Sequence, residues 1–141
     1  MKKILLHGFN SEINKNLQEK YETVLIADDP SADIEYIKIR DHVIQEGDAE
    51  VENEILKYVS TFSSIIYECY SRHHYMKVWN APTVQYYHRL MIAHIRWSKD
   101  LLIKFSPDVL IFSNVAHEGY DNVLAIVAKY LGFKVYFFYE T

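Results

Sequence analysis

Apolar residues along the 141-residue chain follow two different spacings, and these spacings alternate from one end of the chain to the other. Short continuous apolar runs are typical of strands buried on both faces, and they cover residues 2–7, 23–27, 108–112 and 134–139. Residues 34–39 alternate between apolar and polar side chains, which predicts a strand that is half-buried or at a sheet edge. Apolar side chains at helical spacing predict helices over residues 12–20, 49–71, 82–105 and 120–131.

Three residues predict where helices begin and end. Ser11 is the expected N-cap of the first helix, and Pro107 marks the end of the third helix. Gly132 follows the last helix, where a residue with positive φ is expected. The elements then follow one another as β-α-β-β-α-α-β-α-β. This order predicts the α/β class, with a Rossmann-like, doubly wound sheet of about five mainly parallel strands flanked by helices.

Length, charge and cysteine usage narrow the class of protein. A chain of 141 residues, half of them hydrophobic, has the size of one domain. The formal charge of −4 disfavours nucleic acid as a partner, and no apolar run is long enough to span a membrane. The single Cys69 excludes an intrachain disulfide and is expected to be a buried, inert thiol. The N-terminus lacks the features of a secretory signal, so we expect a cytoplasmic protein.

Polar residues with the potential for chemistry follow the predicted strand 108–112 directly. In parallel sheets, ligands bind beyond the carboxyl ends of the strands, and this loop lies at such an end. His117 is a candidate general acid or base, because imidazole titrates near neutral pH. Glu118 can orient His117 or bind a sugar hydroxyl, and Gly119 allows a close backbone approach or an unusual φ. Asp121 is favoured as a helix cap, with a ligand contact as the alternative.

Further candidate ligand contacts come from the ends of other strands and from the same loop. His7 and Gly8 end the first predicted strand beside a turn into a helix, Asn114 begins the polar loop, and Glu140 follows the last strand. The glycine fingerprints of dinucleotide-binding and P-loop proteins are absent, as is the G-x-S-x-G elbow of α/β-hydrolases. We therefore expect no NAD(P) cofactor. We also expect no metal ion, because the chain has one cysteine and no obvious set of ligands at the spacing of a metal site.

Several remaining polar residues have a simpler structural explanation. The basic stretch 72–77 is interpreted as a solvated loop rather than as a phosphate site, and it lacks the ligands of a zinc site. His88 and His94 lie within a predicted helix and are interpreted as residues at the edge of the core.

The last quarter of the chain, residues 106–141, resembles a known family. The pattern PDVLIFSN-x-x-HEG-x-D followed by VLAIVAKYLGFKVYFFYET resembles the N-terminal domain of bacterial surface (capsular) polysaccharide biosynthesis proteins with GT-B glycosyltransferase architecture. It is also similar in layout to the last βαβ unit in the N-terminal half of UDP-sugar 2-epimerases, although the glycine–aspartate motif of those epimerases is missing. The positions that carry the resemblance are Pro107, Asp108, Ser113, Asn114, His117, Glu118, Asp121, Gly132 and Glu140.

The resemblance implies a function that the residues alone do not give. In such two-domain enzymes the N-terminal half generally binds the acceptor, the C-terminal half holds most nucleotide-sugar contacts, and the cleft between them is the active site. We therefore expect residues 1–141 to be a single Rossmann-like domain, the acceptor-side half of a longer glycosyltransferase that is inactive as an isolated fragment. Its partners would be a sugar acceptor and a nucleotide-sugar donor. The enzyme would work in the cytoplasm, at the inner face of the membrane.

Under that hypothesis His117 or Glu118 would deprotonate the acceptor hydroxyl, and Glu140 would face the same cleft. Two other hypotheses stay open. One is a non-catalytic binding or regulatory domain of flavodoxin-like topology that recruits a partner through an aromatic surface. The other is a small-molecule enzyme complete in itself, with a cleft shared between two copies.

Overall fold

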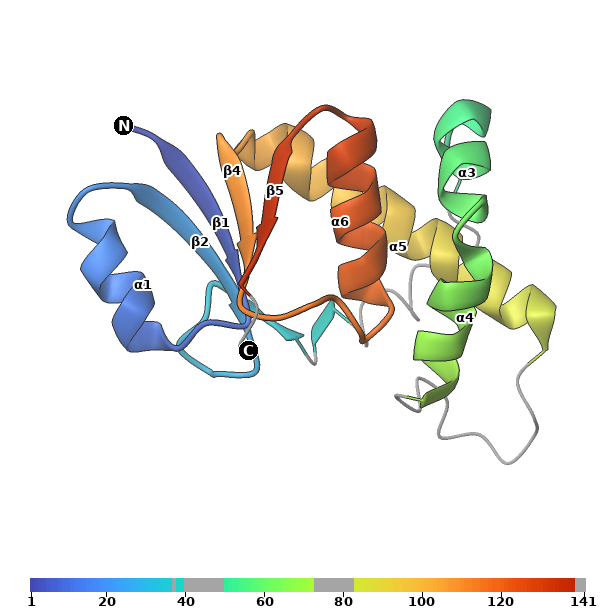
Figure 1. Cartoon of the computed structure of the whole chain (residues 1–141), viewed down its shortest axis with the longest axis horizontal. Helices are drawn as coiled ribbons and strands as arrows, with labels where there is room; N and C mark the ends of the chain where they lie inside the picture. The colour runs from blue at the N-terminus through green and yellow to red at the C-terminus, as the bar shows by residue number, and fades with distance from the viewer. Residues whose placement is uncertain (37, 40–49, 73–82, 139–141) are drawn as a thin grey trace.

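Five strands form one sheet in which every neighbouring pair is parallel, in the order β3-β2-β1-β4-β5 (Figure 1). The structure is a computed structural model and describes residues 1–36, 38–39, 50–72 and 83–138. The strands are β1 Lys3–His7, β2 Glu22–Ala27, β3 Ile34–Glu35, β4 Val109–Phe112 and β5 Lys134–Phe137. The predicted α/β class and the Rossmann-like parallel sheet are confirmed.

Helices cover both faces of this sheet, as a doubly wound fold requires. α1 packs on β2 at one face, while α5 and α6 pack on each other at the opposite face, with α3 and α4 beyond them (Figure 1). No helix among the described residues is long and apolar enough to cross a membrane. The described helices are α1 Ser11–Gln18, α3 Asn53–Ser60, α4 Ser63–Arg72, α5 Val84–Phe105 and α6 Tyr120–Tyr130.

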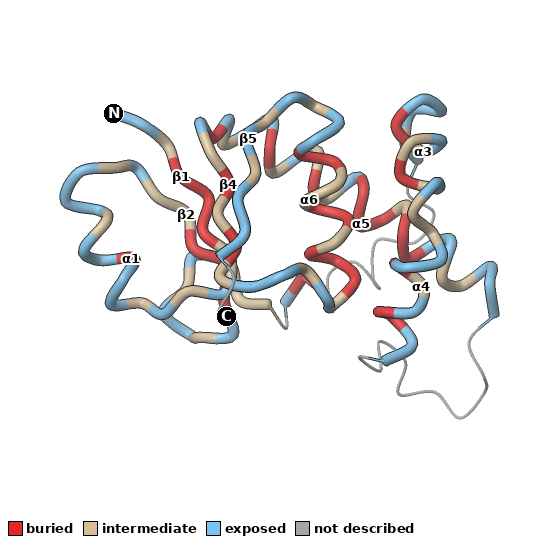
Figure 2. Tube along the Cα trace, viewed as in Figure 1, coloured by how far each residue is buried: buried red, intermediate tan, exposed pale blue. Residues whose placement is uncertain are grey.

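Successive residues of each central strand enter two separate cores, because side chains alternate across a sheet. On β1, Leu5 belongs to the larger core beneath α5 and α6, whereas Ile4 and Leu6 belong to the smaller core on the side of α1. Figure 2 shows buried stretches on β1, β2 and β4 and along α5 and α6. The central strands are therefore the rigid support for the residues at their ends.

The third predicted strand is shorter than residues 34–39. The strand ends at Glu35, and Tyr36, Lys38 and Ile39 are helical. Its pairing gives the reason, because Ile34 and Glu35 are in register with the last two residues of β2. Beyond them β2 offers no further backbone partner. The prediction that this strand lies at a sheet edge is confirmed.

The single helix predicted over 49–71 is two helices. α3 begins at Asn53, and a turn at Thr61 and Phe62 separates it from α4. The Thr61 hydroxyl donates to the Tyr58 carbonyl at 2.7 Å, which takes a carbonyl oxygen that a continuous helix would use. Residue 49 lies outside the described residues.

Helix ends and core positions give further corrections. The N-cap of α1 is Asn10, whose side chain accepts the Ile13 N–H at 2.9 Å, and Ser11 is the first helical residue. Gly132 has φ +85°, as expected. His94 lies inside the core, with no exposed surface, rather than at its edge.

His94 makes the fold sensitive to acid. Its Nδ1 lies 2.6 Å from the Tyr70 hydroxyl, and burial lowers its pKa from 6.5 to about 3. Unfolding exposes the imidazole and restores its ordinary pKa, so the unfolded state binds the proton first as the pH falls. The stability that neutral His94 provides is present above pH 6.5 and is lost as the pH falls toward about 3.

We expect the free energy of unfolding to fall by about 1.4 kcal/mol per pH unit across that window from this group alone. Urea unfolding at a series of pH values measures the slope. His94→Gln lacks the titrating group and should show a shallower slope, whatever its stability at neutral pH. Equal slopes in the two proteins would contradict this assignment.

Candidate functional site

The site lies where the strand order changes direction. The chain passes from β1 to β2 on one side and returns to β4 on the other, so the carboxyl ends of β1 and β4 form a topological switch point. In open parallel sheets this is where ligands bind. A pocket of about 370 Å³ opens here, within the size range of small-molecule sites. It is lined by His7, Gly8, Phe9, Asn10, Ile26, Ala27, Asp28, Asp29, Tyr36, Glu118 and Tyr120.

His7 and Tyr120 join the two sides of the switch point. Nε2 of His7, the last residue of β1, shares a hydrogen bond of 2.6 Å with the hydroxyl of Tyr120, the first residue of α6. Burial lowers the pKa of His7, and burial also raises the pKa of Tyr120. Both shifts favour the uncharged form. The pocket therefore contains a neutral imidazole whose ring is held by a neutral phenol.

Glu118 is a further titratable group in the pocket whose pKa is shifted. Burial is the largest cause that raises its pKa, and the negative charge of Asp121 raises it further. A hydrogen bond with Tyr36 acts in the opposite direction. A carboxyl group with a raised pKa accepts and returns protons closer to neutral pH than an ordinary glutamate does, which suits general acid–base chemistry.

Asp121 holds the backbone that carries Glu118. Its carboxylate accepts the N–H groups of His117 at 2.9 Å and Glu118 at 2.8 Å, and the residue is almost fully buried. The favoured prediction made Asp121 the helix cap, but the N-cap position of α6 is Gly119. Asp121 is the second residue of the helix, two positions after the cap, and its carboxylate bonds backward to the loop. Its effect on a ligand is therefore through the position and pKa of Glu118.

Removal of the Asp121 carboxylate should destabilise this loop. Asp121→Ala leaves two part-buried N–H groups without their acceptor, so we expect the free energy of unfolding to fall by about 1–3 kcal/mol. Asp121→Asn keeps one acceptor oxygen and should cost less. Amide hydrogen exchange at His117 and Glu118 should accelerate in both variants.

Asp100, an exposed carboxylate on α5, supplies the matched control. Asp100→Ala should leave exchange at the loop unchanged. Unchanged loop exchange in Asp121→Ala would show that its carboxylate does not hold the loop.

The other predicted site residues divide into three groups. Gly8 lines the pocket with His7 and Glu118. Gly119 is buried against the ring of Tyr70, where it shapes the loop. His117 and Asn114 are exposed and do not line the pocket. Nδ1 of His117 contacts the Val115 carbonyl at 2.8 Å, and Asn114 accepts the Val115 N–H.

Glu140 lies outside the described residues. Of the other side chains expected at the same cleft, His7 and Glu118 line one pocket and His117 does not.

Sequence reasoning missed four titratable residues that line the pocket. Asp28 and Asp29 follow β2 directly, and the rule that selected His7 at the end of β1 would also have selected them. Tyr120 enters the sequence prediction only as the first residue of the helix 120–131, and its contact with His7 spans 113 positions of sequence. Tyr36 was assigned to a strand, and nothing in the local pattern indicated its contact with Glu118.

The single cysteine lies outside the pocket lining. Cys69 is buried, and burial raises the pKa of its thiol, so it is not an activated nucleophile. Within the described ranges, no three His, Cys, Asp or Glu side chains are placed to hold a metal ion.

Comparison of the chain with protein-family models, with curated proteins and with solved structures finds no match.

Proposed function

We propose that this domain binds a sugar at the switch-point pocket and activates one of its hydroxyls, as the acceptor side of a glycosyltransferase for surface polysaccharide. The observation that carries the proposal is the shared pocket of Glu118 and the His7–Tyr120 pair. Each group has a pKa shifted by burial, and shifted groups in one cleft are typical of acid–base sites. The resemblance of residues 106–141 to acceptor-side domains supports the same conclusion.

The chemistry required is the transfer of a glycosyl group from a nucleotide diphosphate to an acceptor oxygen. Glu118 takes the proton from the acceptor hydroxyl as that oxygen attacks the anomeric carbon of the donor. The new carbon–oxygen bond forms while the bond to the nucleotide diphosphate breaks, and the leaving group takes the electron pair. Donor contacts would come from a second domain in this proposal, because the phosphate-binding glycine fingerprints are absent here.

In this scheme the His7–Tyr120 pair orients the acceptor hydroxyl and does not take its proton. Nε2 of His7 is already engaged by Tyr120, whereas Glu118 has carboxylate oxygens with several acceptor sites. A neutral imidazole and a phenol can hold an acceptor oxygen without adding charge to a pocket that already contains carboxylates.

The first test is direct binding. Titration of the protein with monosaccharides, followed by NMR or calorimetry, should detect binding that weakens in Tyr120→Phe. That variant keeps the aromatic ring and removes only the hydroxyl at His7. Tyr130→Phe removes a hydroxyl from an exposed ring at the other end of α6 and is the matched control. Absence of sugar binding to the unaltered protein would rule out the proposed function.

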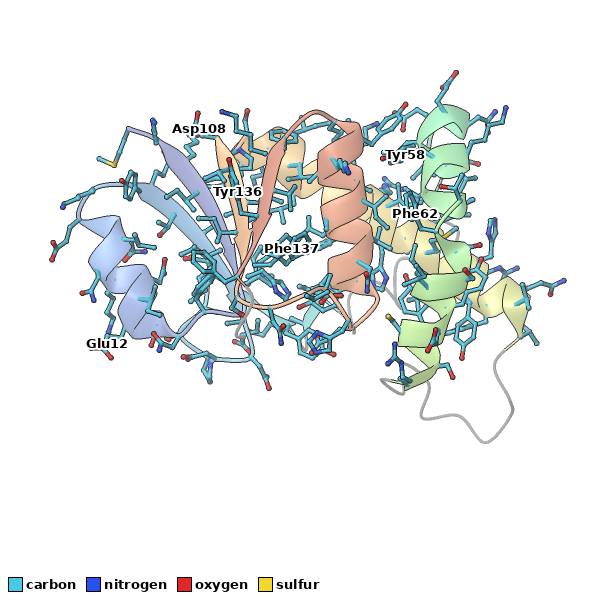
Figure 3. The ribbon with its side chains drawn as sticks, in the orientation of Figure 1. Glu12, Tyr58, Phe62, Asp108, Tyr136 and Phe137 are labelled. Atoms are coloured by element: carbon cyan, nitrogen blue, oxygen red, sulfur yellow. The ribbon has the colours of Figure 1, made fainter. Side chains whose placement is uncertain are left out.

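A second candidate, a binding module without catalysis, is favoured by a separate apolar groove. A cavity of about 460 Å³ runs over α6, with α3 and α4 on one side and β5 on the other. Figure 3 shows Tyr58 and Phe62 on the α3 side and Phe137 on the β5 side. The lining is mostly apolar, and Phe137 and Ile65 are exposed, which is typical of a surface that another molecule covers.

A charged substitution in the groove distinguishes the two candidates. Ala125→Glu places a carboxylate on the half-buried groove face of α6 and should abolish recruitment of a partner without affecting sugar binding. Loss of sugar binding in that variant would connect the two surfaces and count against separate functions.

A further inference from the structure

We infer that the switch-point pocket selects a hydroxyl-bearing ligand that also carries a positive charge, such as an amino sugar, and rejects phosphorylated sugars. The inference rests on the proposed function and names the class of its acceptor. It comes from the charges that line the pocket, from the contacts at two helix N-termini and from the aromatic rings in its wall.

Among the residues that the structure describes, the pocket lining contains three carboxylates and no lysine or arginine. Asp28 and Asp29 follow β2, and Glu118 comes from the loop before α6. The negative charge of Asp28 contributes to the raised pKa of both Glu118 and Tyr120, so it acts on the same volume as the catalytic candidate. Lys15 of α1 offsets part of the charge of Asp29 but is not in the lining. A cation inside the pocket would be attracted by all three carboxylates.

The helix N-termini beside the pocket do not offer a site for phosphate. In many α/β proteins these ends bind anions through free N–H groups. At α1, Asn10 accepts the Ile13 N–H, and Asp29 interacts with the Ser11 side chain. At α6, Asp121 is the second helical residue, and its carboxylate lies in the first turn and accepts the His117 and Glu118 N–H groups of the preceding loop. At the start of α1 a neutral cap takes the place of an anion. At the start of α6 the protein supplies the negative charge itself.

Aromatic side chains complete the wall and suit the same class of ligand. Phe9, Tyr36 and Tyr120 line the pocket, and the rings of Tyr36 and Tyr120 lie 5.0 Å apart between centroids. Aromatic faces attract cations and pack against the apolar side of sugar rings. Carboxylates beside such rings can pair with an ammonium group while His7 and Tyr120 contact hydroxyls.

A matched series of hexoses tests the inference. Glucosamine, N-acetylglucosamine, glucose and glucose 6-phosphate share the pyranose ring and differ in the charge of one substituent. NMR titration near neutral pH should show that glucosamine binds about tenfold or more tightly than glucose, which corresponds to about 1.4 kcal/mol. N-acetylglucosamine, which lacks the charge, should bind like glucose, and glucose 6-phosphate should bind most weakly.

Asp28→Asn tests whether the preference for glucosamine comes from the carboxylates of this pocket. This substitution keeps the shape of an exposed side chain and removes one charge, so the ratio of glucosamine to glucose affinity should fall by about threefold or more. Asp100→Asn, at an exposed position of α5 that does not line the pocket, should leave the ratio unchanged.

The outcomes separate this inference from the proposed function. Equal affinity for all four sugars, or tighter binding of glucose 6-phosphate, overturns the charge preference and leaves the sugar pocket standing. A preference for glucosamine that persists in Asp28→Asn and in Glu118→Gln overturns its assignment to this pocket. Failure of all four sugars to bind overturns the proposed function together with the inference.

Discussion

Gly119→Ala should destabilise the protein more than any other single methyl group added to this loop. A Cβ at Gly119 would lie 2.3 Å from Cδ1 and 2.5 Å from Cε1 of Tyr70, whose ring is fully buried and cannot move aside cheaply. Its backbone also has φ +96°, a conformation that side chains disfavour. Overpacking and backbone strain each cost about 1–3 kcal/mol, so we expect a loss of about 2–6 kcal/mol in the free energy of unfolding.

Gly132→Ala separates the two causes. Gly132 also has a positive φ, of +85°, but no atom lies within 4 Å of a Cβ built there. Strain alone should cost about 1–2 kcal/mol in that variant. Chemical unfolding of both proteins gives the difference that belongs to the Tyr70 contact. Equal losses in the two variants would show that the packing of Gly119 on Tyr70 contributes nothing.

Under the proposed function, Glu118→Gln should reduce sugar transfer by about 10²–10⁴-fold, the usual contribution of a general base, while binding of an uncharged sugar such as glucose changes little. Glutamine keeps the size of the side chain and a hydrogen-bond acceptor for Tyr36, but it cannot take a proton. The assay needs the donor-binding half that the proposal requires. Because burial raises the pKa of Glu118, transfer by the unaltered enzyme should decline on acidification at a higher pH than an ordinary glutamate would give.

His117→Ala is the matched comparison, since His117 is the neighbouring residue and the other candidate base. It is exposed and does not line the pocket, so its loss should leave transfer within about threefold of the unaltered enzyme. A large loss of sugar transfer in His117→Ala, together with full activity in Glu118→Gln, would show that His117 is the base and Glu118 is not.

The fold was predictable because its signal is local and repeated. Continuous apolar runs marked four strands, and the long runs between them marked helices, which together require a parallel sheet. The same logic placed His7 and the loop before α6 at one edge. The two wrong elements depend on information outside their own segments. Tyr36, Lys38 and Ile39 do not continue the strand, since β2 ends at Ala27, and at the break the Thr61 hydroxyl donates to the Tyr58 carbonyl.

The candidate site was predictable in position and not in detail. Strand ends selected His7, Gly8 and Glu118, which line the pocket. The role of Asp121 depends on the direction of its carboxylate, backward to the loop rather than into the pocket, and a sequence does not give that direction. The contact of Tyr120 with His7 depends on the register between β1 and β4, which only the assembled sheet determines.

The most direct measurement is an amide NMR titration of the protein with glucosamine, read residue by residue. The largest amide chemical-shift changes should cluster at Gly8, Glu118 and Tyr120, around the carboxyl ends of β1 and β4. Residues of the α6 groove, such as Ala125 and Lys129, should stay unchanged. Shifts confined to the groove, or no shifts at saturating sugar, would contradict a ligand site at the switch point.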